Sequence, residues 1–359
     1  MKKITIIYIC NSNIGPYYYF MFKELSKLTN LICIIVPDKA QPRPWPDALK
    51  NNICWDVIET NKIKNIYKTL KNCSPDLIIV AGNKKEYLIP AILAKIKKIP
   101  CVLASDTPYE RYPNKVKNKI KILITKLLFD GLFVPGKMAL NYRISQGFPK
   151  DRIWTGLCVT DNEHFRNYKN RWLLPKGFPE KYFLTVSRLS KEKNISCLLE
   201  AFKKYREKGG KWGLVIAGRG PDEKKLKSSV PSYLKDFIYW ADWVNYDELP
   251  DLYHSASCFI LPSVWEPWGV VVNEAMAAGL PILISNRCGC VQDLCYGGMN
   301  GFSFDPLNVN QLSELMLKIS SGELNLRKMG EESRRIISNY TPEKWAETVV
   351  KMCESLLKR

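Results

Sequence analysis

The chain has 359 residues, which is enough for about two domains of ordinary size. Its 46% apolar and 25% charged residues exclude a largely disordered or collagen-like protein. No apolar run approaches the roughly 20 residues of a membrane-spanning helix. The apolar start, residues 4–10, is too short for a signal peptide and lacks a small-residue cleavage pattern, so we expect a cytoplasmic protein.

Positive charge is concentrated in the first half of the chain. Residues 1–170 hold 28 lysines and arginines against 13 acidic residues, whereas residues 171–359 hold 26 against 22. The net charges of the two halves are therefore +15 and +4. This asymmetry indicates an anionic partner for the first half, either nucleic acid or an anionic membrane surface. A lysine-rich composition imposed by an AT-rich genome is the alternative explanation.

Short apolar runs alternate with amphipathic stretches, which is the pattern of parallel sheets covered by helices. In the first half, runs rich in isoleucine and valine predict strands buried on both faces, over 4–10, 31–36, 54–58, 76–81, 101–105 and 131–134. Helices are expected between them, over 17–28, 63–73, 87–97 and 115–128.

A polar stretch with Pro175, Gly177 and Pro179 interrupts this pattern, and a second series follows it. Its predicted strands are 182–186, 213–217, 237–240, 258–261, 281–284 and 301–304, with helices over 195–205, 249–255 and 270–278. Thr341-Pro342-Glu343 is a helix-start signal. We expect a first domain over 1–165, a linker over 166–180, a second domain over 181–340, and a helix over 341–359 that packs back towards the first domain.

The twelve cysteines are scattered, mostly inside apolar runs, and no C-x-x-C occurs. The cluster of Cys288, Cys290 and Cys295 lacks a fourth ligand at the spacing of a zinc site. We therefore expect reduced structural thiols, no metal site and no cofactor.

The most specific local signal is P-S-V-W-E-P-W-G-V-V-V-N-E-A-M-A-A-G-L-P over residues 262–281. A buried strand runs into a loop with Glu266, and Gly269 then opens a helix that carries Glu274, eight positions after Glu266. Ligands of open α/β sheets bind at the carboxyl ends of strands, where helix N-termini offer free N–H groups. The two glutamates are candidate ligand-binding groups; a capping carboxylate and a solvated helix residue are the alternative.

Two further strand-to-helix loops carry candidate site residues. Arg188 and Lys193 follow the first strand of the second series and precede a helix, an arrangement that suits a diphosphate. Ordinary surface basicity is the alternative. Gly218 and Gly220 form a glycine turn after the next strand, which alone is a weak signal.

In this order, the three segments resemble the retaining GT-B glycosyltransferases of family 4 (group 1), which move a sugar from a nucleotide donor. The resemblance runs from Tyr182 to about Phe304, and the pattern P-S-x-x-E-x-x-G-x-x-x-x-E-A-M-A-x-G-x-P is highly specific. It implies an α/β protein of the GT-B fold, with two doubly wound Rossmann-like domains facing each other across a cleft. The first domain would bind the acceptor and the second the nucleotide sugar.

The resemblance also implies which residues act. Arg188 and Lys193 would hold the donor diphosphate and neutralise it as it leaves, and Glu266 would bind sugar hydroxyls near the reacting carbon. Relatives often carry a histidine at the end of a first-domain strand; the matching strand here ends in Asp106, which we take as the polar residue beside the sugar. The other donor-binding positions would be Gly15, Gly218, Trp268, Gly269, Val270 and Glu274, the last of them at the ribose.

This chain departs from its relatives at several of these positions. Only Gly15-Pro16 stands where many relatives have two adjacent glycines in the first loop, and Trp268 replaces a common phenylalanine. Asp242 stands where relatives often have glycine in the loop that binds the base.

The expected activity is retaining, metal-independent transfer of a hexose-type sugar from a nucleotide-diphosphate sugar to a glycan. A nucleotide-sugar epimerase of the same fold and an inverting transferase are alternatives; a non-catalytic nucleic-acid-binding protein is a remote one. A lipid-linked acceptor in bacterial surface polysaccharide synthesis (O-antigen, capsule or lipopolysaccharide) is the leading expectation, at the inner face of the cell membrane.

Two segments are candidates for contact with that membrane or with the acceptor. Over residues 115–128, lysines flank a single apolar helix face, as in helices that lie on membranes. A core helix with a basic outer surface is the alternative. The proline-rich stretch 37–49, with Arg43 and Trp45, is the second candidate.

Overall fold

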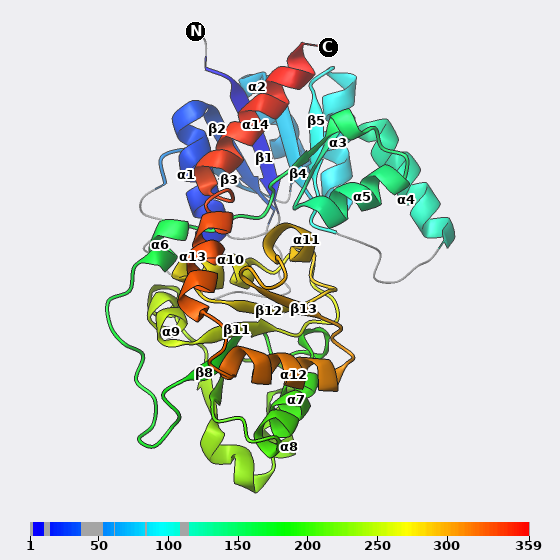
Figure 1. The fold of residues 1–359 in the computed structure, drawn as a ribbon. Coiled ribbons are helices and arrows are strands. Elements are labelled where there is room, and N and C mark those ends of the chain that lie inside the picture. Colours follow the sequence, from blue (N-terminus) through cyan, green and yellow to red (C-terminus); the bar gives the residue numbers. More distant parts are fainter. Residues whose placement is uncertain are drawn as a thin grey trace. The chain divides into compact units, whose positions relative to one another are not determined.

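The chain folds as two units, each built on a parallel sheet (Figure 1). The computed structural model describes residues 3–10, 15–36, 53–60, 62–82, 85–107 and 115–358. One unit comprises Met1–Thr160 and Tyr340–Arg359, and the other comprises Asp161–Asn339. The stretch 37–49 lies outside the described residues, so its expected acceptor or membrane contact stays a prediction.

The first unit holds a seven-stranded sheet in the order β3-β2-β1-β4-β5-β6-β7. The strands are β1 (Thr5–Cys10), β2 (Asn30–Ile35), β3 (Asp56–Glu59), β4 (Leu77–Ala81), β5 (Cys101–Ala104), β6 (Gly131–Val134) and β7 (Ile153–Thr155). All neighbours pair in parallel. The apolar runs predicted the first six of these strands. They did not predict β7, because three residues are too few to show a periodicity.

Both faces of this sheet are covered by apolar side chains, as the isoleucine-rich runs predicted. In β1, Tyr8 faces one buried cluster and Ile7 and Ile9 face another. The covering helices are α1 (Pro16–Leu28), α2 (Ile63–Cys73), α3 (Lys85–Ile96), α4 (Lys115–Leu128), α5 (Lys137–Ser145) and α14 (Pro342–Leu357).

Helix α14 packs against α1, far from it in the sequence. It begins where Thr341-Pro342 predicted a helix start, and the Lys344 N–H donates to Thr341 Oγ1. Trp345 is 1% exposed and lies among Tyr8, Phe22 and Phe133. The last helix of the chain is therefore part of the core of the first unit.

The second unit holds a six-stranded sheet in the order β10-β9-β8-β11-β12-β13. Its strands are β8 (Tyr182–Val186), β9 (Gly213–Ala217), β10 (Ile238–Asp242), β11 (Cys258–Leu261), β12 (Ile282–Ser285) and β13 (Gly301–Phe304), all predicted. Its helices are α6 (Asn162–Arg166), α7 (Ile195–Glu207), α8 (Glu223–Ser229), α9 (Leu249–Ser255), α10 (Val270–Ala278), α11 (Val291–Leu294), α12 (Val309–Ser320) and α13 (Leu326–Ile337).

Both sheets follow the doubly wound order 3-2-1-4-5-6, with one additional strand on the first. Strand order reverses between β1 and β4 in one sheet and between β8 and β11 in the other. Loops that leave the sheet at such a reversal diverge to opposite faces, and the crevice between them is the usual ligand site.

The linker expected over residues 166–180 is wrong, because this stretch belongs to the second unit. The N–H groups of Lys169 and Asn170 donate to Asp251 Oδ1 over 2.7 and 3.1 Å, and the Trp172 N–H donates to Ser255 Oγ over 2.8 Å. Side chains of α9 thus fix the backbone of this stretch through hydrogen bonds. The boundary between the two units lies between residues 160 and 161, whereas the sequence predicted that the first domain ends at residue 165.

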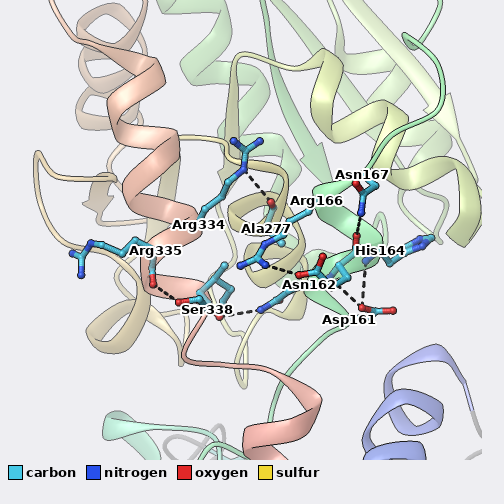
Figure 2. A network of polar contacts seen from close by, with 11 residues as sticks. Asp161, Asn162, His164, Arg166, Asn167, Ala277, Arg334, Arg335 and Ser338 are labelled. Carbon is cyan, nitrogen blue, oxygen red and sulfur yellow. Dashed lines mark hydrogen bonds and ion pairs between the residues drawn. The ribbon is translucent and has the colours of Figure 1, made fainter.

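The segments that enter and leave the second unit are joined to each other (Figure 2). Asp161 caps α6 by accepting the His164 N–H, and Asn162 Nδ2 donates to the carbonyl of Ile337 over 3.0 Å. Arg334 Nη2 donates to the carbonyl of Ala278, at the end of α10, over 2.6 Å. Helices α6 and α13 thus both pack on α10.

We expect Trp345→Ala to lower the free energy of unfolding of the first unit by about 3–5 kcal/mol, the cost of a large cavity in a packed core. The Trp345 indole N–H has no acceptor among the described residues, so this loss measures packing alone. Urea denaturation measures it. Trp243→Ala, at a 43% exposed tryptophan of the second unit, is the control and should cost less than about 1 kcal/mol. Equal losses in both variants would contradict the assignment of α14 to this core.

Candidate active site

The crevice at the strand reversal of the second unit holds an ion pair between two of the predicted site residues. Lys193 Nζ donates to Glu266 Oε2, and their side chains are only 15% and 10% exposed. Lys193 lies in the loop after β8, and Glu266 lies in the loop after β11. Because these strands are neighbours at the reversal, a cation and a carboxylate separated by 73 positions meet there.

Backbone contacts fasten these two loops together. The Val264 N–H donates to the carbonyl of Glu192 over 2.9 Å. Asn194 Nδ2 donates to the carbonyls of Pro262 and Pro306 over 3.2 and 2.8 Å. Asn194 has a φ of +56°, a left-handed conformation that asparagine tolerates better than most residues. The ion pair is therefore held by loops whose shape is set before any ligand binds.

Arg188 lies in the same loop and pairs with Glu192. Its Nη2 lies 3.1 Å from Glu192 Oε1, and its side chain is 54% exposed. This surface pair is worth little in stability, so a ligand with a stronger negative charge can take the guanidinium from Glu192.

The turn between Glu266 and α10 is shaped by the loop that follows β12. The Gly289 N–H donates to the carbonyl of Glu266 over 3.0 Å, and the Cys290 N–H donates to that of Trp268 over 3.2 Å. The Trp268 ring is buried, and its Nε1 donates to Asn273 Oδ1 over 2.9 Å. The indole thus serves to anchor the turn.

Gly269 stands immediately before α10 with a φ of +98°, which a residue with a side chain adopts only under strain. This conformation turns the chain into the helix directly after the Glu266 loop. The first N–H groups of a helix, here from Val270 on, have no partner within the helix and suit an anionic ligand.

Glu274 lies about one turn into α10 and is fully buried. Its Oε2 accepts a hydrogen bond of 2.7 Å from the Tyr253 hydroxyl. Glu266 lies in the loop before α10 and Glu274 within the helix, so the two carboxylates can contact different parts of a ligand. The alternative of a solvated helix residue is wrong for Glu274.

Gly218 contributes through its backbone. It has a φ of +128°, and a Cβ there would collide with the carbonyl oxygen of Ser187 in the Arg188 loop. Its N–H donates to the carbonyl of Asp242. Asp242 itself has a φ of +49°, which accounts for the glycine that relatives often carry there. Asp242 also lies 3.2 Å from Lys227 Nζ, so its carboxylate is paired.

Two predicted site residues belong to the first unit. Gly15 is buried and caps α1, just beyond the carboxyl end of β1 at the strand reversal of that sheet. Asp106 is exposed and follows β5. They stay predicted donor contacts, each described within its own unit.

Arg143, a buried arginine of α5 close to Asp106, was not predicted as a site residue. Its Nη2 donates to Ser105 Oγ over 2.7 Å and its Nη1 donates to Gln146 Oε1 over 2.9 Å, while the buried Nε has no acceptor among the described residues. Burial lowers the pKa of its guanidinium, and the neighbouring Asp106 carboxylate raises it. One arginine in a basic helix carries no sequence signal of this kind.

The two histidines pack against aromatic rings or bond to backbone carbonyls, and most of the cysteines are buried. His164 stacks on Tyr246 with ring centroids 4.2 Å apart, and His254 Nε2 lies 3.0 Å from the carbonyl of Phe165. All twelve cysteines are free, and burial raises the pKa of the Cys288 and Cys290 thiols well above the ordinary value. Such thiols stay protonated. In the described part of the chain, no three histidine, cysteine or acidic side chains are grouped to hold a metal ion.

Two doubly wound sheets and a crevice with paired cation and carboxylate define an α/β protein of the GT-B class. Solved structures share this fold. The structure of Anabaena HepE in complex with UDP matches 99% of this chain and 100% of its own, with a TM-score of 0.79 at 15% identity. The lipopolysaccharide outer core galactosyltransferase WaaB matches over 98% of this chain and 99% of its own, with a TM-score of 0.73 at 17% identity.

Residues 167–342 match the family model described as glycosyl transferases group 1. The mannosylfructose-phosphate synthase of Agrobacterium fabrum is 30% identical over 177 residues, which are 46% of this chain and 39% of the synthase. The alpha-monoglucosyldiacylglycerol synthase of Streptococcus pneumoniae is 26% identical over 284 residues, 69% of this chain and 64% of that enzyme. The recognition made from the sequence is confirmed for the family and the fold.

Proposed function

We propose that the protein transfers a hexose-type sugar from a nucleotide-diphosphate sugar to a glycan acceptor, with retention of configuration and without a metal ion. The Lys193–Glu266 pair at the strand reversal of the second unit is the observation that supports this most directly. HepE, whose structure was solved with UDP and with UDP-glucose, supports a nucleotide sugar as donor.

In this proposal, Lys193 and Arg188 face the donor diphosphate. The sugar–phosphate bond breaks through an oxocarbenium-like state, so negative charge on the diphosphate grows as the bond lengthens. A fixed cation stabilises that charge more in the transition state than in the bound donor. Lys193 is held in place by Glu266 before the donor arrives, so little reorganisation is needed.

Glu266 has two roles in the same scheme. Without donor it neutralises Lys193, and with donor its second oxygen is available to sugar hydroxyls near the reacting carbon. Glu274, about one turn into α10, would meet the ribose while Tyr253 orients its carboxylate. Free N–H groups at Gly269 and Val270 would add to diphosphate or sugar binding.

Retention separates this proposal from its closest alternatives. A same-face attack, with the leaving phosphate accepting the acceptor's proton, gives a product with the donor's anomeric configuration. An inverting transferase gives the opposite configuration, and an epimerase gives a changed sugar without transfer. Product NMR distinguishes the three, and a nucleic-acid-binding protein would release no nucleoside diphosphate in a donor screen.

We further propose a lipid-linked acceptor, at the inner face of the cell membrane, in bacterial surface polysaccharide synthesis. The net charge of +15 on residues 1–170 supports an anionic surface as partner. Two relatives support a lipid-bearing acceptor by their names: the lipopolysaccharide galactosyltransferase WaaB and the streptococcal alpha-monoglucosyldiacylglycerol synthase. No helix in the described ranges is long and apolar enough to cross a membrane.

Glu266→Gln and Glu274→Gln should each lower kcat/KM about 30- to 1,000-fold, the 2–4 kcal/mol typical of a lost preorganised contact. The Glu274→Gln side chain keeps an oxygen for the Tyr253 hydroxyl, so the unfolding curve of this variant should stay close to that of the parent. Release of nucleoside diphosphate measures the rate. Glu331→Gln, at an exposed surface pair, is the control. Parental turnover in either site variant would contradict the assignment.

Arg188→Ala and Lys193→Ala should each weaken donor binding and slow transfer by about 10- to 150-fold, because a hydrogen bond to a charged group contributes about 1.5–3 kcal/mol. Lys191→Ala, at an exposed lysine of the same loop, should change neither. EDTA should leave the parental rate unchanged; a rate that depends fully on added Mg²⁺ or Mn²⁺ would contradict the proposal.

Asp106 is proposed to lie beside the transferred sugar, with Arg143 as its positioning residue. Asp106→Asn should lower kcat with little change in the donor KM. Arg143→Lys should keep most of the activity because it keeps the charge, whereas Arg143→Met should lower kcat as Asp106→Asn does. Rates and melting temperatures are measured together. If Arg143→Lys and Arg143→Met lose activity equally and only in step with melting temperature, Arg143 is structural.

A further inference from the structure

Helix α4 exposes an apolar stripe to solvent. Ile120, Leu123 and Leu127 keep 53%, 58% and 60% of their surface exposed, and Ile124 is also exposed. These four residues have the spacing i, i+3, i+4 and i+7, so they form one continuous face of the helix. Single exposed apolar side chains are ordinary, but a continuous stripe of four marks an interaction surface.

The core of the first unit accounts for the opposite face of α4. Ile122 and Leu128 pack against the buried cluster, and Thr125 is buried with its hydroxyl donated to the carbonyl of Lys121 over 2.8 Å. Helix α4 is therefore a core element on one face, and its outer face is apolar rather than simply basic. Two interpretations of this helix were open from the sequence, a helix that lies on a membrane and a core helix with a basic outer surface. The core interpretation describes the face that packs on the sheet, and the membrane interpretation concerns the outer face.

Helix α3 enlarges this surface. It connects β4 to β5 as α4 connects β5 to β6, so right-handed crossovers place both helices on the same side of the sheet, where they pack together. Ile92 and Ile96 lie one turn apart on α3, and Ile96 is 72% exposed. The outer surface of these helices, made of Ile92, Ile96, Ile120, Leu123, Ile124 and Leu127, is called the α3–α4 face below.

Lysines border the α3–α4 face. On a helical projection, Lys119 and Lys126 lie on one side of the α4 stripe and Lys121 lies on the other, and all three are exposed. Residues 115–128 contain no acidic residue. The face thus combines an apolar centre with cationic margins, the composition of helices that lie in the interface of an anionic bilayer.

We propose that the α3–α4 face docks on an anionic lipid bilayer, with the isoleucines and leucines entering the headgroup boundary and the lysines facing lipid phosphates. The lysines at the margins of the α3–α4 face favour an anionic bilayer over a second copy of the chain. A second copy of the chain on this face would bring the same lysines together, which opposes self-association. Bilayer docking rests on the proposed glycosyltransferase function in one respect only: docking would give the enzyme access to a lipid-linked acceptor.

The test is flotation of the full chain with vesicles, without donor or acceptor, so a failed enzymatic assignment does not affect the result. We expect binding to vesicles of phosphatidylcholine with about 30% phosphatidylglycerol, little binding to pure phosphatidylcholine, and loss of binding as salt rises. Equal binding to both vesicle types, or none to the anionic vesicles at low salt, would overturn the proposal.

Two double variants separate charge from apolar contact. Lys119→Glu with Lys121→Glu should lower the partition coefficient at least about 30-fold, because each lysine near an anionic surface contributes about fivefold. Leu123→Ser with Leu127→Ser should lower it at least about tenfold. Lys208→Glu with Lys211→Glu, and Leu173→Ser with Leu307→Ser, make matched changes at exposed positions of the second unit and should bind as the parent does.

Circular dichroism and the melting temperature of each variant check that it is folded. If the α4 variants float as the parent does, another surface binds the vesicles and the proposal is wrong. If light scattering shows a parental dimer that the Leu123→Ser, Leu127→Ser variant loses, without vesicle binding by the parent, the face is a dimer interface and the proposal is also wrong.

Discussion

Strand order in the second unit reverses at one point, and the chemistry proposed for this protein depends on that reversal. The loop after β8 and the loop after β11 leave neighbouring strands in diverging directions, and the crevice between them is closed by Lys193 and Glu266. Each of these side chains neutralises the other where a lone buried charge would be costly. The site is therefore stable without a ligand, and in the proposed function donor phosphates would pair with Lys193 and donor hydroxyls with Glu266.

Helix α10 links this crevice to the rest of the second unit. Its first turn follows Gly269, Glu274 lies at its middle, and its last carbonyls accept hydrogen bonds from Arg334. The segments that enter and leave the unit, α6 and α13, both rest on it. Helix α10 therefore fixes both ends of the second unit as well as Glu274.

The features that could be predicted from the sequence are those that a local residue pattern determines. Apolar runs located every strand of four or more residues, and the motif with Glu266 and Glu274 located the crevice. Prediction from the sequence failed where structure depends on tertiary contacts. Strand β7 has only three residues, and Asp251 and Ser255 fix the backbone of residues 166–180. Arg143 is buried where it meets Ser105 and Gln146. The exposed isoleucines of α3 were missed for the same reason, since an apolar helix gives no sign of which side faces water.

The place of α14 has a consequence for biosynthesis. Its residues belong to the core of the first unit, so the second unit is an insertion within the first. During translation, residues 161–339 are complete and can fold while the first sheet still lacks the helix that covers Tyr8 and Phe133. The second unit is therefore complete before the core of the first, although N-terminal domains usually fold first. Until α14 emerges from the ribosome, α1 covers this apolar face of the first sheet without its partner helix, and the part of the face that α14 covers stays exposed.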